Sequence, residues 1–128
     1  MTTQYVRSGS PYEQRYGFSR GVRIGALIEI AGTAPIPPAD EPLAATAYGQ
    51  MLRCSEIAVA ALEELGATAD DVIRTRMFIT DPDDADEIGR AHQQVFGNAM
   101  PAATMVVVAA LLEPAWKVEI ELEAVAKN

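Results

Sequence analysis

The last quarter of the chain contains two strand patterns that constrain the fold. Residues 117–124 alternate between apolar and charged side chains, which is the period of a strand with two unlike faces. Residues 105–110 are instead apolar at every position. A strand that is apolar on both faces has to be buried on both faces, and in so small a chain the second cover can come from another subunit. The patterns predict two neighbouring strands and an oligomer.

Composition limits the kinds of partner. The chain has 128 residues, with 10 Lys and Arg against 18 Asp and Glu, which gives a net charge of −8. A chain of this length buries about 65–70% of its unfolded surface, so we expect residues 1–128 to form a single domain with an N-terminal arm at 1–16. The negative charge argues against a nucleic acid or an anionic membrane as partner, because both are bound through basic surfaces.

Cysteine and histidine are too rare for a disulfide or a structural metal. Cys54 and His92 are the single examples of their types, whereas a zinc site needs several such ligands at close spacing. The N-terminus has no cationic region followed by an apolar stretch, and no segment reaches the roughly 18 apolar residues of a membrane span. We therefore expect a cytoplasmic protein that binds no metal.

The remaining periodicities predict the order ββαβαββ. Gly25 separates the first two strands, Gly66 follows the first helix as a left-handed cap, and Asp81–Asp84 place acidic groups at the start of the second helix. The predicted strands lie at 18–24, 26–31, 73–79, 105–110 and 117–124, and the helices at about 42–65 and from Asp84 to Gly97. Two helices cover one face of a sheet of about five strands, and the other, partly apolar face still has to be hidden from water.

Five segments, in this order and at these separations, resemble landmarks of the Rid/YjgF family, the reactive intermediate deaminases. They are Gly17–Gly25, Ala31–Pro35, Asp71–Asp81, Pro101–Thr104 and Val118–Glu121. The resemblance implies an α+β, chorismate-mutase-like fold, with a mixed sheet and two helices on one face. It also implies a homotrimer with a central barrel, small-molecule clefts between subunits, and hydrolysis of enamines and imines to ketoacids and ammonia without a cofactor.

The same resemblance assigns candidate site residues. Glu121 corresponds to the family's glutamate that positions or activates water, and it is the candidate catalytic residue. Ala103 stands where active members carry an arginine that holds the substrate carboxylate, so its methyl group counts against generic 2-imino acid deaminase activity. The candidate substrate-binding residues are Phe18, Ala31, Gly89, His92, Ala103 and the main chain of Met105.

Each candidate also has a structural interpretation. By pattern alone Glu121 is a solvated carboxylate on a polar strand face, and His92 is a packing residue on the apolar stripe of its helix. Arg74 and Arg76 share a strand face and are expected to pair with Glu119 to Glu123 on a neighbouring strand. Cys54 is expected to be an inert core residue. Arg15, Arg20 and Arg23 are other cations near the first strand that could reach a cleft.

Two hypotheses of different class follow. The first is a RidA-like hydrolase of a small enamine, imine or related intermediate, with Glu121 as general acid and base. The alternative is a non-catalytic trimer that binds or senses a metabolite in the same cleft between subunits. The missing arginine at position 103 counts against generic 2-imino acid deaminase activity in either case, and the retained glutamate favours the enzyme.

Overall fold

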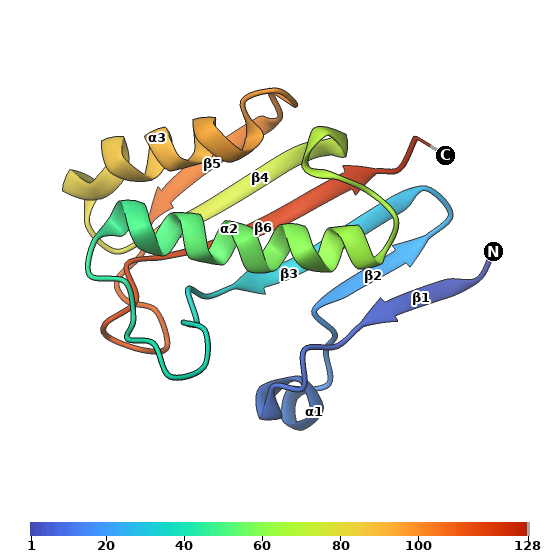
Figure 1. Cartoon of the computed structure of the whole chain (residues 1–128), viewed down its shortest axis with the longest axis horizontal. Helices are drawn as coiled ribbons and strands as arrows, with labels where there is room; N and C mark the ends of the chain where they lie inside the picture. The colour runs from blue at the N-terminus through green and yellow to red at the C-terminus, as the bar shows by residue number, and fades with distance from the viewer. Residues whose placement is uncertain (128) are drawn as a thin grey trace.

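The computed structural model describes residues 1–127 and contains a six-stranded mixed sheet with its two long helices packed on one face (Figure 1). The strand order is β1-β2-β3-β6-β4-β5, and the paired strands are antiparallel except β4 and β5, which are parallel. The elements are β1 (Thr3–Val6), α1 (Pro11–Tyr16), β2 (Gly21–Ile24), β3 (Leu27–Thr33), α2 (Ala47–Glu64), β4 (Val72–Ile79), α3 (Ala85–Phe96), β5 (Ala102–Val107) and β6 (Val118–Val125), with single 3₁₀ turns at Ala69–Asp71 and Pro82–Asp84.

Helix α2 shows how local sequence sets the ends of an element. It begins at Ala47 rather than near residue 42, because Thr46 has extended backbone and its side chain accepts a hydrogen bond from the N–H of Gly49, as an N-cap does. It ends at Glu64, and Gly66 has a φ of +92°, the left-handed conformation that glycine adopts without a steric penalty. The predicted cap at Gly66 is confirmed.

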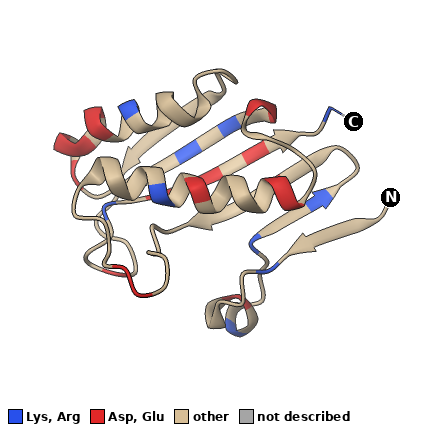
Figure 2. Ribbon diagram, viewed as in Figure 1, with Lys and Arg blue, Asp and Glu red and all other residues tan. Residues whose placement is uncertain are grey.

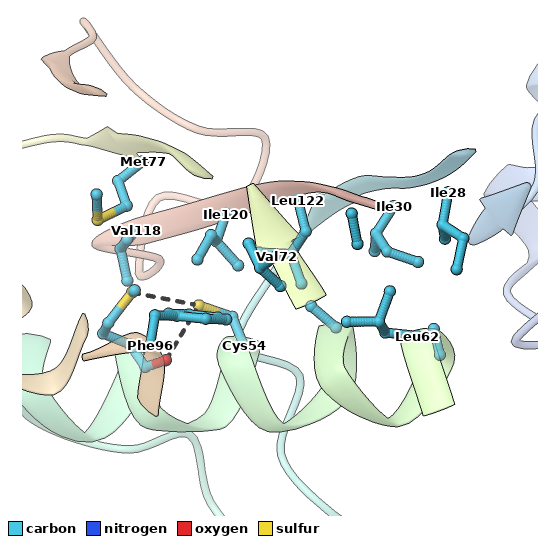
Figure 3. Packing of buried hydrophobic residues seen from close by; sticks show 14 of the residues in the cluster. Ile28, Ile30, Cys54, Leu62, Val72, Met77, Phe96, Val118, Ile120 and Leu122 are labelled. Carbon is cyan, nitrogen blue, oxygen red and sulfur yellow. Dashed lines mark hydrogen bonds between the residues drawn. The ribbon is translucent and has the colours of Figure 1, made fainter. Parts of the chain in front are cut away.

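The core lies between the sheet and helices α2 and α3 (Figure 3). Ile120 and Leu122 of β6 and Leu62 of α2 are fully buried, and burying each such side chain contributes about 1.5–3 kcal/mol. Cys54 is buried in the same layer, and desolvation by burial raises the pKa of its thiol to about 12. The thiol is therefore protonated at neutral pH. The burial of Cys54 confirms the prediction that it is a core residue.

The N-terminal residues are more ordered than the sequence predicted. Residues 1–16 lack a clear period, yet residues 3–6 form β1, which pairs antiparallel with β2, and residues 11–16 form α1. The prediction that this stretch is an irregular arm is therefore wrong for residues 3–6 and for residues 11–16. A four-residue edge strand and a six-residue helix are too short to show a period.

The prediction that the last two strands are neighbours is also wrong. Strand β4 lies between them, pairing parallel with β5 and antiparallel with β6. A parallel pair needs a crossover connection, and α3 supplies it between β4 and β5. Strand β5 begins at Ala102 and ends at Val107, and in the single chain its residues are exposed except for the partly buried Met105.

The sheet face away from α2 and α3 is uncovered in the single chain, as expected. Ile24, Leu27 and Val125 form one cross-strand row and are each at least 40% exposed. Beside them runs a charged row, in which the arginines of β4 lie next to the glutamates of β6 (Figure 2). We call this surface, centred on Leu27, Arg76 and the glutamates of β6, the open face.

The core makes a direct stability prediction. Leu62→Ala removes a side chain with 0% exposure and leaves a cavity, so the free energy of unfolding should fall by about 2–5 kcal/mol in urea titrations. Leu112→Ala, at a position that is 85% exposed, is the matched control and should change it by less than about 0.5 kcal/mol. Equal losses in the two variants would contradict the assigned core.

Candidate functional site

An open cavity of about 1070 Å³ lies where residues 5–19 approach the open face of the sheet. The N-terminal segment forms one wall, and strands β2, β3 and β6 form the other. Phe18, Ala31 and Glu121 all line this cavity, so the structure brings together the candidate catalytic residue and two of the candidate substrate-binding residues.

Buried polar contacts hold the N-terminal wall in place. Glu13 of α1 is 4% exposed; it accepts a hydrogen bond from the N–H of Ser8 at 3.0 Å and lies 3.8 Å from Nε of Arg20. Arg20 in turn donates from Nη1 to the carbonyl of Gly32 at 2.9 Å and to Oγ1 of Thr33 at 3.0 Å. These contacts connect α1 to β3, and they engage Arg20 in the wall itself.

Glu121 lies on the open face beside a cation. Its Oε1 is 3.7 Å from Nη1 of Arg76, and Nη2 of the same guanidinium is 3.4 Å from Oε1 of Glu123. The predicted pairing of Arg76 with the glutamates of β6 is confirmed. Arg74 differs, because its Nη2 donates to Oγ1 of Thr104 on β5 at 2.6 Å. Glu121 is about a third exposed, so its carboxylate is accessible from the cavity that it lines.

A second carboxyl group of the cavity, Glu29, was missed from the sequence. Glu29 of β3 is in register with Glu123 of β6. Partial desolvation raises the pKa of Glu29 to about 7, and the hydrogen bond and charge of Glu123 act in the same direction, against the opposing effect of Arg76. Near neutral pH the cavity therefore holds a carboxyl group that both donates and accepts protons. The sequence alone does not show which residue of β6 pairs with Glu29, and this pairing places Glu29 beside Glu123.

The other candidates lie on the opposite side of the sheet. Ala103 of β5 is in register with Thr75 of β4, which is fully buried under the helices, and Met105 has the same strand phase and packs against the core. Gly89 and His92 belong to α3. Within one chain these residues do not join Glu121.

His92 has the contacts of a packing residue. Its Nε2 is 2.8 Å from Oγ1 of Thr75, and its ring centroid is 5.1 Å from that of Phe96. Burial lowers the pKa of His92, which keeps the ring neutral at physiological pH. These contacts explain its place on the inner stripe of α3 without a catalytic role.

The described part of the chain has neither a metal-ligand cluster nor a membrane-spanning helix. Among residues 1–127, no three His, Cys, Asp or Glu side chains gather as metal ligands. No helix in the same range is long and apolar enough to cross a bilayer.

The fold and cavity define the class: a small α+β protein with the chorismate-mutase-like fold, as in solved structures that it resembles. The family model Ribonuc_L-PSP, described as Endoribonuclease L-PSP, matches residues 10–126, and the chain belongs to this family, the Rid/YjgF family. The predicted family and fold are confirmed.

Relatives of known sequence or structure cover nearly the whole chain. The "Uncharacterized protein SCO2049" of Streptomyces coelicolor is 35% identical over 97% of this chain and 95% of its own. The crystal structure of Rv2704 from Mycobacterium tuberculosis, described as a member of the YjgF/YER057c/UK114 family, is 38% identical with a TM-score of 0.90, covering 98% and 100%. The 2-iminobutanoate/2-iminopropanoate deaminase of Salmonella typhimurium is 27% identical over 85% of each chain.

Glu29 predicts a particular dependence of stability on pH. In the unfolded chain Glu29 ionises near its ordinary pKa of 4.5, whereas in the folded chain its pKa is about 7. Between these values the folded state holds a proton that the unfolded state has lost, so the free energy of unfolding should fall as pH rises from about 4.5 to about 7. Glu29→Gln should flatten this part of the profile.

The measurement is a set of urea titrations from pH 4.5 to 8 at one protein concentration. Glu63→Gln, on the exposed side of α2, is the control and should leave the slope unchanged. An unaltered slope in Glu29→Gln would show that another group holds the proton.

Proposed function

We propose that the protein is a cofactor-free hydrolase of a small enamine, imine or related reactive intermediate. The observation that carries this proposal is the cavity that Glu121 and Glu29 line together with Phe18 and Ala31. Two carboxyl groups in one cavity, one beside the guanidinium of Arg76 and one with a pKa of about 7, are suited to moving protons in both directions.

Hydrolysis of an imine needs few groups. Glu121 takes a proton from water as the oxygen adds to the C=N carbon, while the protonated carboxyl of Glu29 donates to the nitrogen. The resulting carbinolamine loses its amine when the nitrogen receives a second proton, from Glu121, and the hydroxyl proton returns to Glu29. The products are a carbonyl compound and ammonia, and both carboxyl groups end in their starting states.

The active assembly in this proposal is a homotrimer with a cleft between subunits. The open face exposes apolar side chains of β2, β3 and β6, and an apolar surface of this kind is normally covered by a partner. Ala103, Met105, Gly89 and His92 lie near the β5 edge on the opposite face. In the proposed trimer the β5 edge of a second copy lies beside the open face of the first, so that those residues reach the cavity of the first.

A small substrate fits the charges better than RNA does, although the matching family model carries the description endoribonuclease. The chain has a net charge of −8, and the cavity is lined by Glu13, Glu29 and Glu121 against one arginine, Arg7. Phosphate groups are bound through basic surfaces. The alternative to catalysis is a trimer that only binds or senses a metabolite. Ala103 does not decide between the two, because a methyl group that offers a carboxylate no hydrogen bond counts against generic 2-imino acids in either case.

Glu121→Gln separates these alternatives. The amide keeps the shape of the side chain and removes its titrating proton, so imine hydrolysis should slow by roughly 10²–10⁴-fold. Ammonia release would be followed while an amino-acid dehydratase generates 2-iminobutanoate. Glu63→Gln is the control and should keep the full rate. An unchanged rate in Glu121→Gln would remove Glu121 from the mechanism, and a wild-type protein that never accelerates ammonia release would favour the binding trimer.

The assembly is tested by sedimentation at micromolar concentration, which should give about three times the chain mass of 13.7 kDa. Leu27→Asp puts a charge on the open face, where Leu27 is 48% exposed, and should shift the distribution toward monomers. Leu112→Asp alters an exposed loop residue and should leave the mass unchanged. A wild-type monomer would contradict the trimer and its shared cleft.

A further inference from the structure

Arg7 has an unusual position among the arginines of the chain. It follows β1 and lines the cavity, and within the described residues it is the single Lys or Arg that does so. Its guanidinium carbon lies 5.4 Å from the centroid of the Tyr5 ring, which lines the same cavity. A ring beneath a guanidinium attracts the cation and restricts its orientation, so the planar group is supported from one side.

The arginines near the cavity are engaged elsewhere. Arg20 donates to Gly32 and Thr33 in the wall, and Arg76 pairs with the glutamates of β6. Arg15 stacks on Tyr12 and Tyr16 outside the cavity lining. Across residues 1–127, Arg7 donates no hydrogen bond to a carboxylate or carbonyl of the chain, so its N–H groups are available to a ligand.

The carboxyl groups of the cavity do not neutralise Arg7. Glu13 is buried and bound by Ser8 and Arg20, and Glu121 faces Arg76. Glu29 shares a hydrogen bond with Glu123. Among the charged side chains that line the cavity, Arg7 is therefore the one without an ion pair or hydrogen bond to another described residue. A guanidinium presents a planar fork of donors whose geometry matches a carboxylate, which it binds through two parallel hydrogen bonds.

We propose that Arg7 binds the carboxylate of the ligand in this cavity and thereby makes the site specific for small carboxylates. The inference rests on the proposed function, because it names the class of molecule that Glu121 and Glu29 would act on. The guanidinium of Arg7 would bind the carboxylate, which the methyl side chain of Ala103 on β5 does not do. The group comes from the N-terminal segment, on the wall opposite the sheet.

The test compares a carboxylate with its neutral amide. Binding of 2-oxobutanoate and of 2-oxobutanamide would be measured by calorimetry on the wild type, Arg7→Gln and Arg15→Gln. Arg7→Gln should lower the affinity for 2-oxobutanoate at least tenfold and leave the affinity for 2-oxobutanamide unchanged. Arg15→Gln removes a second arginine that stacks on tyrosine from the same segment, and it should change neither affinity. Arg7→Lys keeps the charge without the fork and should recover part of the carboxylate affinity.

Several results would overturn the inference. One is that the wild type and Arg7→Gln bind 2-oxobutanoate with equal affinity. A second is that the wild type does not bind 2-oxobutanoate at millimolar concentration. A third is that Arg7→Gln loses affinity for 2-oxobutanamide as well, which would mean that the substitution reshapes the cavity. Release of ammonia from 2-iminobutanoate is measured in a separate assay. Carboxylate binding through Arg7 without turnover would reject the proposed hydrolase and keep Arg7, whereas turnover with an unchanged KM in Arg7→Gln would reject Arg7 and keep the hydrolase.

Discussion

The alternation along β6 is the constraint on which the rest of the structure depends. This strand lies between β3 and β4, and its even-numbered residues from Val118 to Ala124 are fully buried against the helices. A period of two then forces the glutamates between them onto the open face. A slip of one residue in register would bury three carboxylates and expose the core, so the strand that supplies the middle of the core also fixes Glu121 in the cavity wall.

Burial and close carboxylates on the open face together set the protonation of Glu29. Glu29, Glu121 and Glu123 lie near one cation, Arg76, which reaches Glu121 and Glu123. Desolvation by burial is the main cause that raises the pKa of Glu29 to about 7, and the hydrogen bond and charge of Glu123 add to it, while Arg76 opposes it. Burial also raises the pKa of Glu119, with Arg20 opposing. Burial, aided by the neighbouring carboxylates, therefore keeps a protonated carboxyl group in the cavity that Glu121 also lines.

Local sequence predicted the elements whose cause is local. The stripe of α2, the cap at Gly66, the alternation of β6 and the pairing of Arg76 each depend on spacing along one element or on two facing strands. The pairing of β4 with β5, the strand β1 and the proton on Glu29 depend on which segments meet across the fold. Arg7 was missed for the same reason: residues 1–16 have no period of their own, and their structure comes from β2 and from the contact of Glu13 with Arg20.

Ala103, which stands where the family resemblance implies an arginine, and Arg7 concern the same physical requirement of the proposed reaction. A reaction at a C=N bond needs its carbon held within reach of a carboxylate and a water, and orientation within about an ångström controls the rate. An arginine on β5 and an arginine in the N-terminal segment would bind the substrate carboxylate on different sides of the C=N carbon that faces Glu121. In the proposed site the position of the cation would set which length and shape of carboxylate reaches Glu121, while the two carboxyl groups would set the chemistry that follows. In that proposal, specificity and reaction type would depend on separate segments of the chain.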